Sequence, residues 1–153
     1  MVPFTFGMTT TQVFKTLDDR VDAVYADKIS AASSQPKLEA RLDKEKESKK
    51  KALRDKLSTF VAGKGVSGYE MVTPGEFTYS NGESVLEVGR DGGGTRCLFF
   101  MHDRLYKIYD VVALEKKDGE LGETWDAAVA KLEASLGEKG KRYEPKATLA
   151  SYY

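Results

Sequence analysis

The chain has 153 residues, and its 24 lysines and arginines are balanced by 24 aspartates and glutamates, so the formal net charge is zero. This balance offers no overall attraction to nucleic acid or to anionic lipid, and it argues against partners of both kinds. A chain of this length favours a single domain, residues 1–153, with a hydrophobic core of its own.

Cysteine content and hydropathy argue against a disulfide-stabilised domain and against a membrane-spanning protein. Cys97 is the only cysteine, so an internal disulfide cannot form, and its apolar neighbours suggest that it is buried. No stretch approaches the ~20 apolar residues of a membrane-spanning helix, and we see no export signal, so we expect no transmembrane segment. The cellular compartment stays open at this point.

The first element expected is a helix over residues 9–33. Thr9 can cap its free amide groups, and apolar residues recur on one face at spacings of three and four. This face consists of Val13, Leu17, Val21 and Val24. Asp18, Asp19 and Asp22 lie elsewhere on the helix, where we expect ordinary surface charge rather than acid–base catalysis.

A second helix is expected over residues 36–60, with Pro36 in its first turn. Its ends are apolar, but residues 43–51 contain no apolar side chain, so this stretch cannot pack into a core. Two i,i+4 ion pairs would support it, each by ~0.2–0.5 kcal/mol. They join Glu45 to Lys49 and Glu47 to Lys51. Residues 1–62 are therefore interpreted as a long helical hairpin with solvated turns along its middle.

A β meander is expected over residues 63–114. Residues 77–80 and 83–88 are typical of strands, and Asn81-Gly82 between them favours the positive φ angles of a two-residue turn. The sequence therefore predicts a hairpin whose two strands pair across Asn81-Gly82.

Two further strands complete the expected meander. The nearly continuous apolar run over 96–101 suggests a central strand, and residues 105–114 are rich in Tyr, Ile and Val. Turns are expected at glycines 92–94 and at His102-Asp103-Arg104. With a short strand over 69–72, these elements predict an antiparallel sheet of at least three strands.

Residues 115–153 are expected to hold one more helix, which Gly122-Glu123-Thr124 begins and Gly137 ends. Its apolar stripe consists of Trp125, Ala128, Val129, Leu132 and Leu136. A final strand over 147–152 is a further expectation. The whole chain is thus predicted to be α+β: a long N-terminal helical hairpin packed on an antiparallel β meander, then a C-terminal helix and this strand.

Glycine, any residue and threonine, followed by apolar residues four and eight positions after the threonine, occur twice in the chain. The two stretches begin at Gly7-Met8-Thr9 and at Gly122-Glu123-Thr124. Two readings stay open: residues 115–153 are a truncated second repeat, or both stretches are simply capped amphipathic helices.

The first of these stretches carries a family resemblance. Phe6-Gly7-Met8-Thr9, followed by Val13, resembles the start of the small outer-membrane assembly lipoprotein domains (SmpA/OmlA, or BamE-like) and of the repeats of β-lactamase inhibitor protein. Residues 98–108, with their turn at Asp103, resemble a late segment of the same domains. The helical hairpin here is longer than in those families, and the paired cysteines of the inhibitor are missing.

The resemblance implies short helices packed on an antiparallel sheet, in a non-enzymatic envelope or secreted domain that binds other proteins. It favours the bacterial periplasm or envelope over the cytoplasm. No binding residue of either family can be assigned to this chain.

No constellation of residues predicts catalysis. Residues 63–68 match G-x-G-x-x-G, but they follow a helix and lead towards strands, whereas a nucleotide loop follows a strand and opens a helix. His102 and Cys97 are an odd number of residues apart on a strand, which places them on opposite faces. One histidine and one cysteine also leave a zinc site short of ligands. We therefore expect no enzyme activity, no cofactor and no metal.

Aromatic and basic side chains remain as candidates for a partner-binding surface. Tyrosine is favoured in protein interfaces, and the densest basic point lies on the second helix, where interleaved acids argue against nucleic acid. The candidate partner-binding residues are Tyr69, Phe77, Tyr79, Tyr106, Lys49, Lys50 and Lys51.

The leading hypothesis from the sequence is a non-catalytic protein-binding or scaffolding domain, in a bacterial envelope if the resemblance holds. Two alternatives stay open: a secreted or periplasmic inhibitor that caps an enzyme, and a self-association module that uses the charged helical hairpin. A hydrolase based on Cys97 or His102 is a hypothesis of a different class.

Overall fold

The fold is α+β in a computed structural model, as the sequence predicts. The structure describes residues 4–61, 70–73, 76–78, 81–91, 93–114 and 119–141. The chain divides into two compact units, Met1–Val111 and Val112–Tyr153, and each is described by itself. The assignment of all 153 residues to a single domain stays a prediction.

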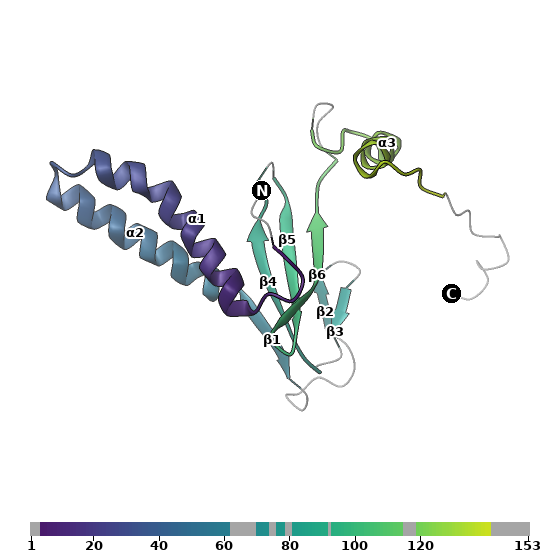
Figure 1. Ribbon diagram of the computed structural model, residues 1–153, viewed down its shortest axis with the longest axis horizontal. Helices are drawn as coiled ribbons and strands as arrows, with labels where there is room; N and C mark the ends of the chain where they lie inside the picture. Colours follow the sequence, from purple (N-terminus) through teal and green to yellow (C-terminus); the bar gives the residue numbers. More distant parts are fainter. Residues whose placement is uncertain are drawn as a thin grey trace. The chain divides into compact units, whose positions relative to one another are not determined.

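The first unit begins with the expected helical hairpin, which runs away from the sheet in Figure 1. Its helices are α1, Thr10–Ala31, and α2, Pro36–Arg54. At the start of α1, the Gln12 amide donates to the Thr9 hydroxyl at 3.2 Å, and the Thr9 amide donates to the Gln12 side chain at 2.9 Å. This reciprocal capping box satisfies two amides that the helix leaves free, so α1 begins where the sequence predicts.

Side chains from the two helices bind one another along the hairpin. The Tyr25 hydroxyl donates to the Glu45 carboxylate at 2.6 Å. Farther towards the sheet, Lys50 lies 2.7 Å from Asp22, and Arg54 lies 2.5 Å from Asp18. Asp18, Asp22 and Lys50, which were expected to be solvated, therefore join α1 to α2. Glu45 does the same by binding Tyr25 across the hairpin.

A four-stranded antiparallel sheet follows, with strand order β1-β4-β5-β6, and a separate two-stranded sheet pairs β2 with β3. The strands are β1 Leu57–Val61, β2 Glu70–Thr73, β3 Glu76–Thr78, β4 Asn81–Gly89, β5 Thr95–Met101 and β6 Arg104–Val111. The central position predicted for residues 96–101 is confirmed, because β5 lies between β4 and β6.

The predicted end of the second helix is wrong. Residues 57–60 do not continue α2 but belong to β1, which pairs with β4 so that Leu57 lies opposite Leu86 and Phe60 opposite Glu83. The apolar spacing fits either structure over so short a stretch, and the segment is rich in residues that favour strands. Pairing with β4, a contact distant in sequence, decides for the strand.

The predicted hairpin across Asn81-Gly82 is also wrong. The strand before it, β3, pairs with β2, whereas Asn81 and Gly82 belong to β4, which pairs with β1 and β5. The Glu83 carboxylate, largely buried, accepts hydrogen bonds from the Thr78 hydroxyl at 3.0 Å and from the Asn81 amide at 2.6 Å. The edge of β4 that the prediction assigned to β3 is occupied by β1.

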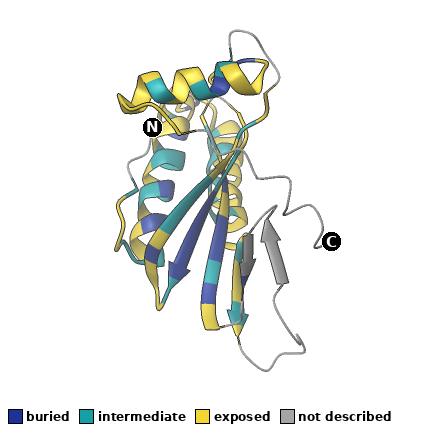
Figure 2. Cartoon of the chain, turned by 90° about the vertical axis from the view of Figure 1, so that its right-hand side faces the viewer, coloured by how far each residue is buried: buried dark blue, intermediate teal, exposed yellow. Residues whose placement is uncertain are grey.

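The core lies on both faces of the four-stranded sheet, whose inner strands are dark blue in Figure 2. On one face α1 packs against the sheet in a cluster made of Val13, Leu17, Leu86, Val88, Leu98, Phe100 and Leu105. On the other face Val85, Cys97 and Phe99 are buried together, with Phe60 and Tyr109 beside them. Burial of Cys97 agrees with the sequence analysis.

The Gly7-Met8-Thr9 segment connects the start of α1 to the turn between β5 and β6. Gly7 has a φ of 88°, and its amide donates to the Leu105 carbonyl at 2.8 Å. The Asp103 carboxylate accepts from the Thr10 amide at 3.0 Å and from the Thr10 hydroxyl at 2.6 Å. The segments around Gly7 and Asp103, which are far apart in the sequence, thus bind each other directly.

We expect Asp103→Gly to destabilise the fold by about 1 kcal/mol, since it removes an acceptor from the first turn of α1. Glycine is chosen because Asp103 has a φ of 59°, which glycine adopts without strain. Urea denaturation measures the change. His102→Gly is the matched control: His102 also has a positive φ, of 49°, and its replacement keeps both bonds to Thr10. An equal loss in both variants would contradict the prediction.

The same bonds predict a pH dependence. The Thr10 hydroxyl and amide lower the pKa of Asp103 below its usual value. A group with a lowered pKa in the folded state stabilises the protein above its unfolded pKa, and this contribution disappears as the pH falls through the folded value. The stability difference between wild type and Asp103→Gly should therefore shrink on acidification below about pH 4.

The second unit contains α3, Trp125–Leu136. The Ala127 amide donates to the Thr124 hydroxyl at 3.2 Å, and Gly137 ends the helix in the left-handed conformation with a φ of 73°. Both ends agree with the prediction from sequence. The final strand expected over 147–152 lies outside the described residues, as does the loop over 63–68.

Candidate protein-binding groove

Most of the predicted aromatic candidates lie outside the part of the chain whose side chains the structure describes. Tyr69 and Tyr79 lie outside the described residues, and Phe77 lies in β3 with its side chain outside the description. Tyr106 is half-exposed on β6, at an irregularity where the pairing passes from Lys107 to Leu105. Tyr106 is therefore the one aromatic candidate whose side chain can be placed, and it lies on an edge strand.

The three candidate lysines have different roles on α2. Lys50 lies 2.7 Å from Asp22, which raises the pKa of Lys50 and lowers the pKa of Asp22. The Lys49 ammonium lies 5.3 Å from the centre of the Tyr25 ring. Lys51 is exposed. Two of the three therefore contribute to the hairpin itself rather than forming a solvated basic point.

The residues considered for chemistry are also separated. Cys97 is buried in the sheet, whereas His102 is exposed in the turn after β5. Asp18 and Asp22 each bind a cation of α2 across the hairpin. Within the described ranges, no three His, Cys, Asp or Glu side chains are grouped so that they could hold a metal ion.

A groove that the sequence analysis did not identify lies between α1, α2 and the end of β4. Its wider part has a volume of about 220 Å³ and a mostly apolar lining. The lining residues are Leu17, Arg20, Val21, Val24, Tyr25, Lys49, Leu53, Val88 and Gly89. Val13 and Leu17 of the predicted helix face are buried, but Val24, farther along α1, is 54% exposed. The apolar face of α1 therefore continues past the core and becomes the groove's wall.

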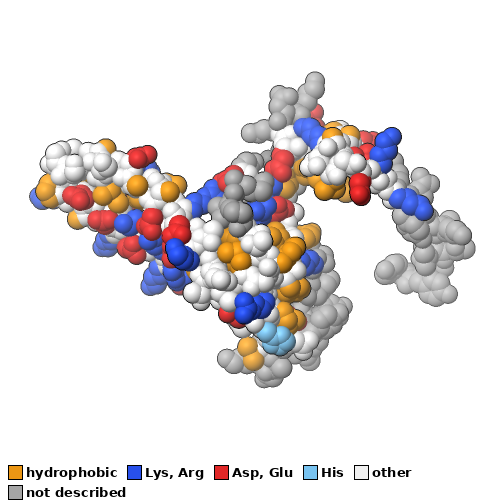
Figure 3. All heavy atoms as spheres, in the orientation of Figure 1, with side chains coloured by type: hydrophobic (Ala, Val, Ile, Leu, Met, Phe, Trp, Pro, Cys, Tyr) orange, Lys and Arg blue, Asp and Glu red, His pale blue; other side chains and the backbone are white. Residues whose placement is uncertain are grey.

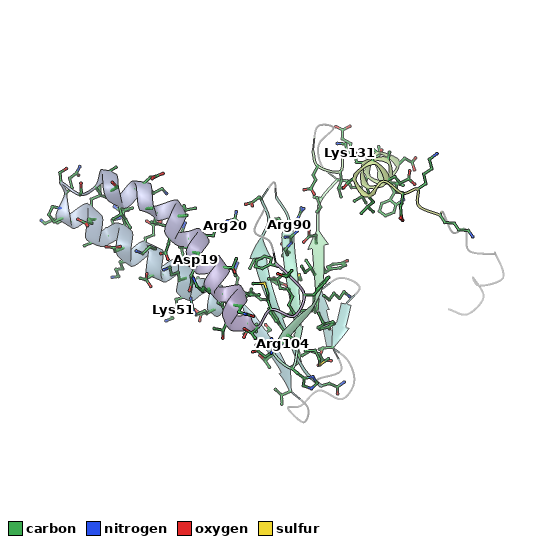
Figure 4. The ribbon with its side chains drawn as sticks, in the orientation of Figure 1. Asp19, Arg20, Lys51, Arg90, Arg104 and Lys131 are labelled. Carbon is green, nitrogen blue, oxygen red and sulfur yellow. The ribbon has the colours of Figure 1, made fainter. Side chains whose placement is uncertain are left out.

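Arginines line the narrower part of this groove, which holds about 40 Å³ and shares Leu17, Arg20, Val88 and Gly89 with the wider part. Its remaining lining residues are Phe4, Arg90, Asp91 and Arg96. Figure 4 shows Arg20 on α1 and Arg90 beside the end of the sheet. The two parts together are called the α1–β4 groove.

Carboxylates hold these arginines in place. Arg20 forms an ion pair with Asp91 across the groove. Arg96 donates two hydrogen bonds to Asp110 at 2.7 Å each, and the Arg90 side chain lies 3.0 Å from the same carboxylate. These cations, Arg96 first, hold the pKa of Asp110 below its usual value.

Among the lining residues that the structure describes, basic side chains outnumber acidic ones. The cations are Arg20, Lys49, Arg90 and Arg96, the lining carboxylate is Asp91, and Asp110 lies behind the arginines. An apolar floor with a basic rim suits a partner that presents apolar side chains flanked by acidic ones.

A second depression, on another side of the hairpin, has the opposite character. It measures about 440 Å³ and is lined by Thr11, Phe14, Lys15, Asp18, Asp19, Asp22, Lys50 and Arg54. Its three carboxylates and three cations compensate one another, and its lining is as polar as it is apolar. It therefore lacks both the mostly apolar surface and the excess of one charge that make the α1–β4 groove a candidate binding site.

Sequence reasoning missed the α1–β4 groove because its parts are distant in the chain. The sequence does show that the apolar stripe on α1 continues through Val21 and Val24. It does not show that Arg20 approaches Asp91, 71 residues later, because this contact depends on how α1 lies on the sheet.

The chain significantly matches no protein-family model, no curated protein and no solved structure. The resemblance to envelope lipoprotein domains stays a prediction. None of the helices in the described ranges is long and apolar enough to cross a membrane.

Proposed function

We propose that the chain is a non-catalytic protein-binding or scaffolding domain, and that the α1–β4 groove is its binding surface. The observation that carries the proposal is the exposed apolar wall of α1, with Val24 at 54% exposure, beside the basic groove rim. Apolar side chains left open to solvent in a concave, charged setting are typical of surfaces that bind another polypeptide.

The inhibitor alternative receives less support from the same geometry. It would use a face of the sheet to cap an enzyme, but the central residues of both faces, such as Leu98 and Phe99, are buried. A location in the bacterial envelope remains part of the proposal only through the family resemblance.

A photo-crosslinking amino acid at position 24 should yield adducts of defined mass in an extract of the cells that make the protein. Val24 lies in the groove wall, so a bound partner would lie within reach of the probe. The same probe at Lys51, an exposed position on α2, is the matched control. Mass spectrometry identifies the adducts.

Val21→Asp in the position-24 probe chain should abolish these adducts, because an aspartate removes an apolar contact and repels the acidic side chains expected on the partner. Equal labelling from both probe positions, or adducts that persist in the Val21→Asp chain, would overturn the assignment of the groove.

A further inference from the structure

A second apolar surface lies on α3, in the unit that the proposed groove does not involve. Trp125 is 70% exposed and Leu136 is 74% exposed, with Leu132 also exposed and Val129 half-buried. These four residues lie at positions i, i+4, i+7 and i+11, which places them along one face of a helix. They are called the α3 stripe, and Figure 3 shows hydrophobic side chains gathered on this helix.

Exposure of this size on a capped helix needs a physical reason. A helix in a globular protein normally turns its apolar face to a core, and large apolar patches left in solvent mark interaction sites. Tryptophan is among the residues most enriched at the energetic centres of interfaces. The α3 stripe therefore has the composition and the exposure of a binding surface.

The charges around the α3 stripe indicate what it would bind. Asp126 and Glu133 lie on the same flank of the stripe, about 80° to 100° round the helix from Trp125. The described segment 119–141 carries five acidic and three basic side chains, so it is net acidic. A complementary surface would be apolar and net basic.

The α1–β4 groove has this composition. Its wider part is lined by apolar side chains from α1, α2 and β4, and among the described lining residues of the groove cations outnumber carboxylates. One chain thus carries both an apolar acidic helix and an apolar basic groove.

We propose that the α3 stripe of one copy docks into the α1–β4 groove of a second copy, so that the protein associates head to tail. The proposal rests on the proposed function in one respect, since it assumes that the groove binds polypeptide. Because the two surfaces differ, the contact is heterologous, and a dimer keeps one free groove and one free stripe to which further copies can bind.

Antiparallel pairing of two α3 helices is less favourable than docking into the groove. In an antiparallel pair related by a two-fold axis, the flanks that carry Asp126 and Glu133 would lie on the same side of the interface and repel each other. Docking into the groove instead brings the acidic helix to a surface whose lining includes Arg20 and Lys49.

Two variants of the full chain separate the surfaces. Val24→Asp puts a like charge into the groove that receives the acidic helix, and Trp125→Ser removes the largest side chain of the stripe. Both residues are more than half exposed, so both variants should fold, which circular dichroism checks. Each variant alone should be monomeric in sedimentation velocity, whereas the wild type should grow in mass with concentration.

The decisive measurement is a titration of Trp125→Ser into Val24→Asp. Trp125 is the only tryptophan of the chain, so the emission reports solely on the stripe of the Val24→Asp chain. We expect a blue shift and a 1:1 dimer, because an intact stripe meets an intact groove. The double variant Val24→Asp, Trp125→Ser lacks both surfaces and should cause no shift when titrated instead.

Two results would overturn the proposal. One is the absence of both shift and dimer up to about 0.5 mM, which would put the dissociation constant at about 1 mM or weaker. The other is a dimer of Val24→Asp by itself, which would indicate pairing between stripes. Either result leaves the proposed function standing if the position-24 probe still labels a different protein through the groove.

Discussion

Replacing Phe100 with alanine is expected to destabilise the protein by ~3–5 kcal/mol, the usual cost of removing a phenylalanine from a core. Phe100 is fully buried on β5, an inner strand, and belongs to the cluster in which α1 packs on the sheet. The substitution leaves a cavity between elements that are far apart in sequence, where the surroundings cannot easily collapse.

Urea denaturation followed by circular dichroism measures this loss, which is a large share of the ~5–15 kcal/mol that stabilises a typical domain. If Phe100→Ala does not fold, Phe100→Leu still tests the prediction, with an expected loss of ~1 kcal/mol. Phe6→Ala is the matched control: Phe6 is largely exposed, so the same chemical change should cost less than about 0.5 kcal/mol. Similar losses at the two positions would contradict the assigned core.

Tyr25→Ala is the second change with a large expected effect, a loss of ~3 kcal/mol or more in the hairpin. Tyr25 is 1% exposed, the Lys28 and Lys49 ammonium groups lie 5.1 and 5.3 Å from its ring centre, and its hydroxyl binds Glu45. One side chain thus fills the space between helices that otherwise meet there through charged groups.

Amide hydrogen exchange should locate the effect of Tyr25→Ala. We expect faster exchange in α2 with smaller changes in β5, since Tyr25 lies on α1 beyond the residues that pack on the sheet. Tyr25→Phe keeps the ring and should be much milder, and Tyr106→Ala is the matched change at a half-exposed tyrosine. If Tyr25→Ala leaves α2 exchange unchanged, the hairpin does not depend on this side chain.

Local signals predicted several elements well. Thr9 and Thr124 cap α1 and α3, Pro36 begins α2, and Gly137 ends α3. Each of these signals acts within a few residues, through a hydrogen bond or a restricted φ angle, so it can be recognised without knowing the rest of the fold.

Contacts between distant residues were predicted poorly. The apolar residues Leu57 and Phe60 fit the end of a helix as well as a strand, and only pairing with β4 distinguishes the two. Asn81-Gly82 has the composition of a hairpin turn, but β1 takes the place beside β4 that the hairpin would have filled. The proposed binding surface was not predicted for the same reason, because Arg20 contacts Asp91 only when α1 packs on the sheet.

By itself, the sequence determined the class of the protein as α+β, the starts of its helices and the central position of β5. It also indicated the Gly7-Met8-Thr9 start of α1, whose capping is local. The tertiary structure alone decided the partner of β4, the binding of Thr10 by Asp103 and the joining of apolar and basic side chains in the α1–β4 groove. The reason is that capping and turn preferences act over a few bonds, whereas strand pairing and groove formation depend on residues that only the folded chain brings together.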